Sequence, residues 1–586
     1  MAVVGGQFLL EKTGSREIFT PEQYSKDELE FAATARRFVE REVIPHIKAL
    51  ENKDYVLGKK LLQKAGELGL LMTGVPEAYG GLGLPHRVSG MLSEAVSGYG
   101  GFSVSFGAHT KIGTLPLVYF GNAEQKQKWL PALASGEKIA AYALSEPGSG
   151  SDAQAATTVA KLSDDGTHYV VNGTKQWITN GSFADVYTVF CQVDDGSGKP
   201  QFSALMVERG TPGFEAGAEE HKLGIRGSST TPLTFVDAKI PVANLLGNPG
   251  DGAAIAFNIL NVGRYTLAMG VNGGAKAALA AAIQYATERK QFGKSTMSFG
   301  ALRQKVAETA AQIYAMETCS YRIAGLSDDM TAAMGPLDES KSGKEKMRPI
   351  EEYAIESSIA KVYCSETLNV LASECLQMYG GYGYVEDYPA ERTFRDSRIN
   401  MIFEGTNEVN RLLVPGMLLK RAMQGRLGAM QWLGSLESGP QPVAEGPLAD
   451  ERDAVDRMKG VAGVLLQAAV GKYMHSLEKE QQILLYLADL LIDAYVGDSV
   501  VGRALYRQKA GLPSAVSDAM TRLTLSHAAD RVRANARACA RSLASGEDLE
   551  KLLKKVDRWA IDLRSNPIAD RDLIADAAVE KGGYPF

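Results

Sequence analysis

The sequence predicts an α+β protein that is mainly helical, with one β domain lying between helical segments. Helical periodicity dominates the first part of the chain. Strand-like runs separated by turn dipeptides follow for about a hundred residues, and helical periodicity then continues to the end. We therefore expect an N-terminal helical domain (1–137), a middle antiparallel β domain (138–248), a C-terminal helical bundle (249–425) and a helical extension (426–586).

The N-terminal helices are predicted from a capping signal and from apolar spacing. Ser25 and Glu28 form an S-x-x-E capping box, and apolar residues follow it at helical spacing as far as Pro45. A second helix is predicted at about 57–70, before the turn-rich segment 74–81.

The β domain is predicted from four runs rich in β-branched and aromatic residues. Turn dipeptides such as Asn172-Gly173 and Asn180-Gly181 lie between them. The runs cover residues 167–171, 185–193, 202–207 and 232–236.

The helical period returns at about residue 251. The runs 273–286 and 360–378 have the character of long bundle helices, and the charged segment 327–349 between them is predicted to be a loop. The proline-containing segment 434–447 is predicted to be a linker to the extension.

The composition argues against several classes of function. The 586 residues are 45% hydrophobic, and 63 Lys and Arg stand against 69 Asp and Glu, a net charge of −6 that argues against a nucleic-acid partner. The most apolar run, 483–496, contains Asp489 and Asp493, so no membrane-spanning helix is expected. The five cysteines form no C-x-x-C and lie at no metal-ligand spacing, so we expect no metal and a cytoplasmic location.

Three segments have residues suited to cofactor chemistry, although no G-x-G-x-x-G motif is present. Segment 142–152 offers serine hydroxyls and flexible backbone amides that suit a heterocycle and a phosphate, or form a polar turn. Trp177, in segment 175–181, could wall a ring system or be an edge aromatic. Glu404, in segment 402–409, is a solvated loop carboxylate or, given its apolar flank, a desolvated base with a raised pKa.

Taken together, these segments resemble one family. The chain resembles acyl-CoA dehydrogenases from end to end, and most closely the very-long-chain type with a C-terminal extension. The motifs stand in family order: Ser-Glu-Pro-Gly-Ser-Gly-Ser-Asp (145–152), Trp-Ile-Thr-Asn-Gly (177–181), Ile-Leu-Asn-Val-Gly-Arg (259–264), Glu-Arg-Lys-Gln-Phe-Gly-Lys (288–294), Gln-Met-Tyr-Gly-Gly-Tyr-Gly (377–383), Arg-Asp-Ser-Arg (395–398) and Phe-Glu-Gly-Thr-Asn (403–407).

The resemblance implies a fold with a C-terminal four-helix bundle and an FAD-dependent reaction. A long-chain fatty acyl-CoA would be dehydrogenated to trans-2-enoyl-CoA, the first step of fatty acid β-oxidation. Glu404 would remove the α-proton while a hydride passes from Cβ to the flavin N5. Some relatives carry the base directly before the arginine that corresponds to Arg264, but Gly263 occupies that position here.

The resemblance also assigns binding residues. Arg289, Gln377, Gly380 and Gly381 would reach the cofactor from a neighbouring subunit. The implied FAD contacts are Tyr142, Leu144, Ser145, Gly150, Ser151, Trp177, Thr179, Arg289, Phe292, Gln377, Gly380, Gly381, Thr406 and Glu408. The implied substrate contacts are Ser151, Asn261, Arg264, Gly405, Ser103 and Gly107.

Chain length and partners are implied in part. Ser103 and Gly107 lie one helical turn apart, where medium-chain relatives close the acyl pocket with bulky polar residues. Their small size favours a long acyl tail, or it serves helix–helix contact. The family implies electron-transferring flavoprotein as electron acceptor, a homodimer, and membrane contact near 426–433 with Trp432. The extension, with 22 basic and 22 acidic residues over 421–586, is neutral, unlike DNA-associated relatives. An acyl-CoA oxidase and a flavoprotein with mainly an assembly role remain the alternatives.

Overall fold

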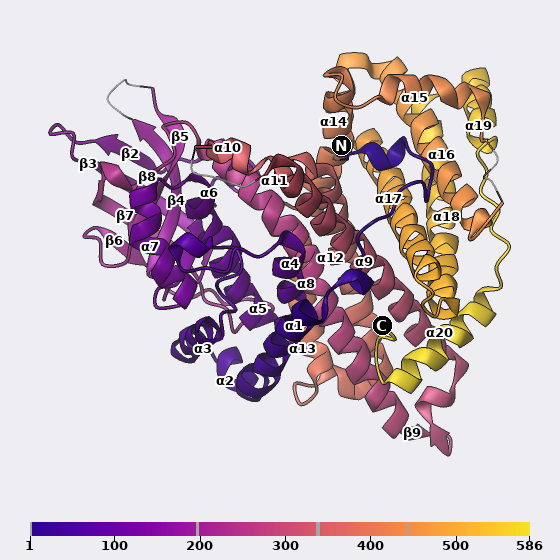
Figure 1. Cartoon of the computed structure of the whole chain (residues 1–586), viewed down its shortest axis with the longest axis horizontal. Coiled ribbons are helices and arrows are strands. Elements are labelled where there is room, and N and C mark those ends of the chain that lie inside the picture. Colours follow the sequence, from indigo (N-terminus) through magenta and orange to yellow (C-terminus); the bar gives the residue numbers. More distant parts are fainter. Residues whose placement is uncertain (1–2, 195–198, 336–339, 442, 444) are drawn as a thin grey trace. The chain divides into compact units, whose positions relative to one another are not determined.

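The computed structural model describes residues 3–194, 199–335, 340–441, 443 and 445–586 (Figure 1). Helices predominate, and the main sheet lies in one part of the chain, so the predicted α+β class is confirmed. The chain divides into two compact units. The sheet unit contains Ser25–Gly274 and Met334–Glu351, and the bundle unit contains Met1–Tyr24, Ala275–Ala333 and Glu352–Phe586. The boundaries of the four predicted domains remain a prediction.

Short helices form the first part of the sheet unit. Helix α1 begins at the predicted capping box, where the Ser25 N–H donates to Glu28 Oε2 at 2.9 Å and the Glu28 N–H donates to Ser25 Oγ at 3.2 Å. A π-helical segment, Ala108–Gly113, directly follows α5. The helices are α1 (Lys26–Phe38), α2 (Ile47–Glu51), α3 (Tyr55–Glu67), α4 (His86–Ala95), α5 (Gly100–Gly107), α6 (Leu115–Phe120) and α7 (Ala123–Ser135).

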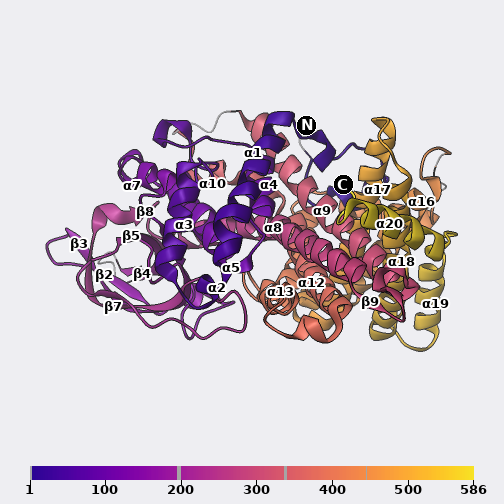
Figure 2. The same ribbon diagram turned by 90° about the horizontal axis from the view of Figure 1, so that it is seen from below.

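One eight-stranded sheet forms the second part of this unit (Figure 2). Its order is β6-β7-β3-β2-β4-β5-β8, with β1 also beside β4, and neighbours are antiparallel except that β1 and β2 run parallel to β4. The strands are β1 (Ala140–Ala143), β2 (Val159–Leu162), β3 (His168–Thr179), β4 (Val186–Asp194), β5 (Gln201–Glu208), β6 (Phe214–Ala216), β7 (Thr230–Pro241) and β8 (Leu245–Leu246). The four predicted runs lie largely in β3, β4, β5 and β7, while the four strands not predicted are too short to show alternation.

Long helices form the bundle. Helix α8 (Gly252–Glu288) begins in the sheet unit and ends in the bundle unit, followed by the hairpin β9 (Lys290–Gln291) and β10 (Lys294–Ser295). The other elements are α9 (Gly300–Met334), α10 (Gly343–Lys346), α11 (Arg348–Glu352), α12 (Ala354–Tyr379), α13 (Pro389–Ser397) and α14 (Asn407–Met423). The loop prediction for 327–349 is wrong at both ends. Helix α9 continues to Met334 with Ser327 and Met330 buried, and α10 and the start of α11 occupy residues 343–346 and 348–349; residues 336–339 lie outside the described part.

The described part of the extension contains six α-helices, of which α16, α17 and α18 lie side by side (Figure 1). Their bounds are α15 (Ala429–Ser435), α16 (Ala449–Tyr473), α17 (Gln481–Lys509), α18 (Ala515–Leu543), α19 (Gly546–Asp557) and α20 (Pro567–Lys581). The predicted linker 434–447 starts inside α15, and residues 442 and 444 lie outside the described part. Among the described helices, none is long and apolar enough to cross a membrane.

The N-terminal segment before α1 packs on the bundle unit. The Gly5 N–H donates to Glu352 Oε1 at 2.9 Å, and the Phe8 ring lies edge-on to Tyr495 of α17 with 4.9 Å between centroids. A Cβ at Gly5 would lie 2.0 Å from the backbone carbonyl oxygen of Glu352, so this close approach requires glycine. The segment therefore belongs structurally to helices more than three hundred residues away in sequence.

Candidate active site

The predicted site residues fall into groups in both units, and each group is built by its own unit. The sheet unit holds Ser103, Gly107, Tyr142, Leu144, Ser145, Gly150, Ser151, Trp177, Thr179, Asn261 and Arg264. The bundle unit holds Arg289, Phe292, Gln377, Gly380, Gly381, Glu404, Gly405, Thr406 and Glu408.

The loop after β1 is a compact turn with one open face. Tyr142 and Leu144 are buried at the strand end, and Glu146 and Ser149 exchange backbone hydrogen bonds of 2.9 and 3.1 Å. Gly150 and Ser151 are exposed, and no described atom lies within 4 Å of a Cβ placed at Gly150. Backbone amides and serine hydroxyls around an uncovered glycine suit the approach of a phosphate-bearing ligand.

A buried ion pair that the sequence did not predict anchors this loop. Lys175 Nζ donates to Glu146 Oε1 at 2.7 Å and to the Leu144 carbonyl at 3.2 Å, and both charged side chains are almost fully buried. Burial opposes ionisation of Glu146, but hydrogen bonds from Lys175 and Thr158 and the Lys175 charge outweigh it and lower the pKa of Glu146 to about 2. The pair fixes the loop to β3.

Strand β3 also carries Trp177, at an irregularity in its pairing with β7. The β3–β7 register shifts between Lys175 and Ile178, and Trp177 takes a left-handed φ of 58°, which is unusual for a bulky residue. Trp177 is 60% exposed, and the Gln176 N–H donates to the Ser145 carbonyl at 2.9 Å. The bulge therefore places an exposed aromatic side chain beside the loop, with the half-buried Thr179 two residues further on.

Two further groups of the sheet unit lie on helices. On α8, Arg264 Nη1 donates to Asn261 Oδ1 at 2.7 Å, and both side chains are buried. On α5, Ser103 and Gly107 are half-buried, and the described residues leave the space around a Cβ at Gly107 open to 4 Å. Gly107 is therefore a position where the helix surface is not filled by protein.

Glu404 occupies a strained turn of the bundle unit, directly before α14. Glu404 and Gly405 both have left-handed φ angles, 59° and 80°, and Glu404 Oε2 is shielded from solvent. Thr406 Oγ1 accepts from the Val409 N–H at 3.3 Å and caps α14, while Glu408 is exposed on its first turn. A backbone hydrogen bond at this helix end lowers the pKa of Glu408.

Two side chains that sequence reasoning missed hold this turn. Lys361 Nζ of α12 donates to the Gly405 carbonyl at 2.8 Å, and Asn410 Nδ2 of α14 donates to the same carbonyl at 2.8 Å. Lys361 and Asn410 are both fully buried. A lysine in the middle of a helical apolar run gives no local signal of this contact, because its partner is 44 residues away.

The remaining predicted residues lie on an aromatic surface of the bundle unit. The Arg289 guanidinium lies 5.3 Å from the Tyr382 ring centroid, and Phe292, at the β9–β10 hairpin, is 91% exposed. Gln377, Gly380 and Gly381 are exposed, and the two glycines have open space around a Cβ among the described atoms. Arg289 forms no ion pair with the residues the structure describes.

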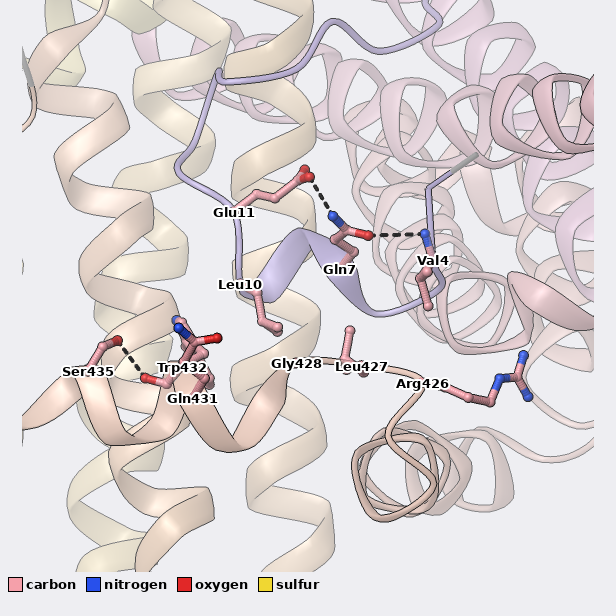
Figure 3. A pocket seen from close by; sticks show the side chains of 10 residues that line it. All are labelled: Val4, Gln7, Leu10, Glu11, Arg426, Leu427, Gly428, Gln431, Trp432 and Ser435. Carbon is pink, nitrogen blue, oxygen red and sulfur yellow. Dashed lines mark hydrogen bonds between the residues drawn. The ribbon is translucent and has the colours of Figure 1, made fainter. Parts of the chain in front are cut away.

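A separate pocket of about 480 Å³ lies between the N-terminal segment and α15 (Figure 3). Val4, Leu10 and Leu427 contribute apolar side chains, and Gln7 donates to Glu11 at 2.8 Å. Trp432 also lines this pocket. Its ring packs closely on α16 at Gly463, where an added Cβ would lie 2.5 Å from the ring. Met430, at 73% exposure, is the exposed apolar side chain of this helix.

Four family models match the chain in order. Three describe the N-terminal, middle and C-terminal domains of acyl-CoA dehydrogenase and match residues 25–137, 141–238 and 250–418. A fourth, also described as an acyl-CoA dehydrogenase C-terminal domain, matches residues 457–558.

Individual relatives match over most of the chain. A probable acyl-CoA dehydrogenase of Bacillus subtilis is 43% identical over 94% of this chain and 93% of its own. The very long-chain specific acyl-CoA dehydrogenase of Mus musculus is 34% identical over 78% of this chain and 72% of its own. The crystal structure of an acyl-CoA dehydrogenase complexed with FAD from Bacillus anthracis matches with a TM-score of 0.96 and 42% identity, over 100% of both chains.

Proposed function

The chain belongs to the acyl-CoA dehydrogenase family, and on that premise we propose that it dehydrogenates long-chain fatty acyl-CoA to trans-2-enoyl-CoA with bound FAD. The observation that carries the proposal is Glu404 in its strained, half-buried turn, at the position where the family motif Phe-Glu-Gly-Thr-Asn has its glutamate. A carboxylate partly removed from water is suited to proton abstraction beside a thioester.

The residues of the sheet unit fit FAD. Ser145 and Ser151 offer hydroxyls, the uncovered Gly150 allows close approach to its backbone, and the exposed Trp177 offers a flat face for a ring system. Bound FAD supplies a hydride acceptor at N5. Arg289, Gln377, Gly380 and Gly381 of a second copy would hold its other end, because Arg289 stacks on Tyr382 and keeps its charge available for a pyrophosphate.

The chain's own residues would then do the acid–base work. The Glu404 carboxylate takes the α-proton, and its backbone N–H donates to the thioester carbonyl, stabilising enolate-like charge. Gly405 leaves room for the acyl chain because it has no Cβ. Arg264 and Ser151 contact the CoA portion, with Asn261 fixing the Arg264 guanidinium through the 2.7 Å hydrogen bond between them.

Open space beside α5 supports a long acyl tail. Ser103 and Gly107 place no bulky side chain on that face, and the region around Gly107 is not filled by described atoms. Each further methylene buried there would contribute about 0.8 kcal/mol to binding. A substrate with a longer tail should therefore be favoured until the space ends.

Exposed apolar residues support two of the proposed interactions, a homodimer and a membrane contact. Phe292, Tyr384 and Val385 of the bundle unit are exposed and apolar, which supports a homodimer formed through this surface. Electron-transferring flavoprotein is the proposed electron acceptor. Membrane contact near 426–433 would use Met430, since Trp432 packs inward on α16.

Anaerobic mixing of the FAD-loaded protein with palmitoyl-CoA tests the proposal. We expect the flavin absorbance to bleach and to recover only slowly in air; fast recovery would indicate an oxidase, and no bleaching an assembly role. The Glu404→Gln variant should retain FAD, and its rate of flavin bleaching should fall by about 10²–10⁴-fold. Glu478→Gln, an exposed carboxylate of the extension, is the matched control and should bleach like the unmodified protein. Normal bleaching in Glu404→Gln would remove the base assignment.

A further inference from the structure

The turn that carries Glu404 has a conformation that its own residues do not favour. Two consecutive residues, Glu404 and Gly405, have φ angles of 59° and 80°. Glycine adopts this region freely, but for glutamate the left-handed region brings Cβ too close to the following carbonyl oxygen. Such a conformation persists only when the surrounding structure holds it.

The carbonyl oxygens of this turn converge on one buried amide. Asn410 Nδ2 donates to the Gly405 carbonyl at 2.8 Å and to the Thr406 carbonyl at 3.0 Å, and the Glu404 carbonyl lies 3.4 Å away. In a trans peptide the N–H points opposite to the C=O. The N–H groups of Gly405 and Thr406 therefore face the side of the turn away from Asn410.

A buried ammonium provides the second support. Lys361 is on α12 and is fully buried, and its Nζ donates to the Gly405 carbonyl at 2.8 Å and to Asn407 Oδ1 at 2.6 Å. Hydrogen bonds from a charged donor are about twice as strong as neutral ones. The ammonium thus ties the turn to α12 through the residue directly after Glu404.

The partner of the ammonium is itself fixed. Asn407 Nδ2 donates to Ser365 Oγ at 3.1 Å and to Glu366 Oε1 at 3.0 Å, and both acceptors are on α12. Asn407 is 2% exposed. The contacts of Lys361 therefore belong to a buried network that joins one helix to the start of the next, and the turn lies at its edge.

We propose that Lys361 is a positioning residue for the dehydrogenation, which holds the Glu404–Gly405 turn in its left-handed conformation so that the Glu404 carboxylate meets the α-proton. The inference rests on the proposed function, because it needs Glu404 to be the base. Removing the ammonium leaves the Gly405 carbonyl with Asn410 as its remaining partner here, and the turn is then free to relax. A displacement of the base by about 1 Å can cost about 10²-fold in rate.

The test uses the FAD-loaded full chain and three variants. Lys361→Met removes the ammonium and keeps the length of the side chain, and Lys361→Gln keeps a donor without charge. Lys459→Met is the matched control, because Lys459 is also buried in the bundle unit and its Nζ donates to Asp498 Oδ1 at 2.6 Å. For each variant we would measure Tm, FAD content, KM, and the rate of flavin bleaching by palmitoyl-CoA in stopped flow.

We expect Lys361→Met to keep FAD and KM while the bleaching rate falls about 10²-fold. The bleaching rate of Lys361→Gln should fall by a smaller factor. Lys459→Met should lower Tm, while its bleaching rate stays within about twofold of that of the unmodified protein. Bleaching by Lys361→Met within threefold of the unmodified rate, or an equal loss in Lys459→Met, would overturn the inference.

If Lys361→Met yields no FAD-loaded protein, Lys361→Gln decides, and an unmodified rate in that variant overturns the inference. Failure of the proposed function has a different signature. It would appear as no bleaching in the unmodified protein, or as normal bleaching in Glu404→Gln.

Discussion

Lys175 Nζ lies 2.7 Å from Glu146 Oε1, and both side chains are removed from solvent. The pair joins the loop after β1 to the strand that carries Trp177, so the two walls of the proposed flavin site share one buried charge pair. Breaking such a pair leaves one charge uncompensated in a low-dielectric interior.

Lys175→Met is therefore expected to destabilise the protein by about 3–5 kcal/mol and to weaken FAD binding. Urea unfolding and titration of the apoprotein with FAD measure the two effects. The double variant Lys175→Met with Glu146→Gln should recover part of the stability, because no unpaired charge remains. Unchanged FAD affinity in the single variant would show that the pair does not shape the site.

Stability should fall between about pH 6.5 and pH 4 because of His109. Burial lowers the pKa of His109 to about 4, below the ordinary value of about 6.5. The neutral ring is needed because Nδ1 accepts from the Ala140 N–H at 2.9 Å while Nε2 bonds the Leu133 carbonyl at 3.1 Å.

The direction of this change in stability follows from which state of the chain binds the His109 proton first. The unfolded chain takes up the His109 proton first, so the contribution is fully present above about pH 6.5 and is lost as the pH falls toward about 4. Urea unfolding at pH 7 and pH 5 measures it. His109→Gln should show a smaller difference between the two pH values, and an equal difference would contradict the assignment.

Lys111 should make the stability of the folded protein depend on pH in the alkaline range. Burial lowers the pKa of Lys111 to about 7, and its Nζ donates to Ser89 on α4, with 3.3 Å to the Ser89 carbonyl. Between about pH 7 and pH 10.4 the unfolded chain holds a proton that the folded chain has lost, so stability rises with pH. Lys111→Met should be more stable than the unmodified protein at pH 7 and should lose this slope in urea unfolding. A slope that persists in the variant would have another source.

The C-terminal tail should contribute to stability through a buried arginine. Arg503 of α17 is 1% exposed and donates to Glu317 Oε2 at 2.5 Å, and the Tyr584 hydroxyl donates to the same oxygen at 2.9 Å. Tyr584→Phe removes a hydrogen bond to a charged group and should cost about 1.5–3 kcal/mol. Tyr473→Phe, at the half-buried end of α16, is the control; equal losses in thermal unfolding would argue against this network.

Gly107→Met should change chain-length preference without unfolding the protein. No described atom lies within 4 Å of a Cβ at this position, and glycine within a helix costs about 0.5–1 kcal/mol relative to alanine, so the fold should tolerate the substitution. We expect kcat/KM for palmitoyl-CoA to fall relative to hexanoyl-CoA. An unchanged ratio would place the acyl tail elsewhere.

Local patterns predicted much of the fold. The Ser25–Glu28 capping box starts α1 as predicted, and the long β-branched runs lie in β3, β4, β5 and β7, because caps and alternation act over a few residues. Helix α9 continues into the segment that was predicted to be a loop, since the buried Ser327 and Met330 continue its packing into a charged sequence. The motif order also identified the family, as the matching domain models agree.

The sequence by itself determined the α+β class, the family and the chemistry-bearing candidates, because these depend on residue types and short spacings. Only the tertiary structure decided which buried side chains hold these candidate residues in place. Lys175 meets Glu146 across 29 residues, and Lys361 meets Gly405 across 44. A buried charge has to be paired within hydrogen-bond reach, and which partner lies there is set by how distant segments pack.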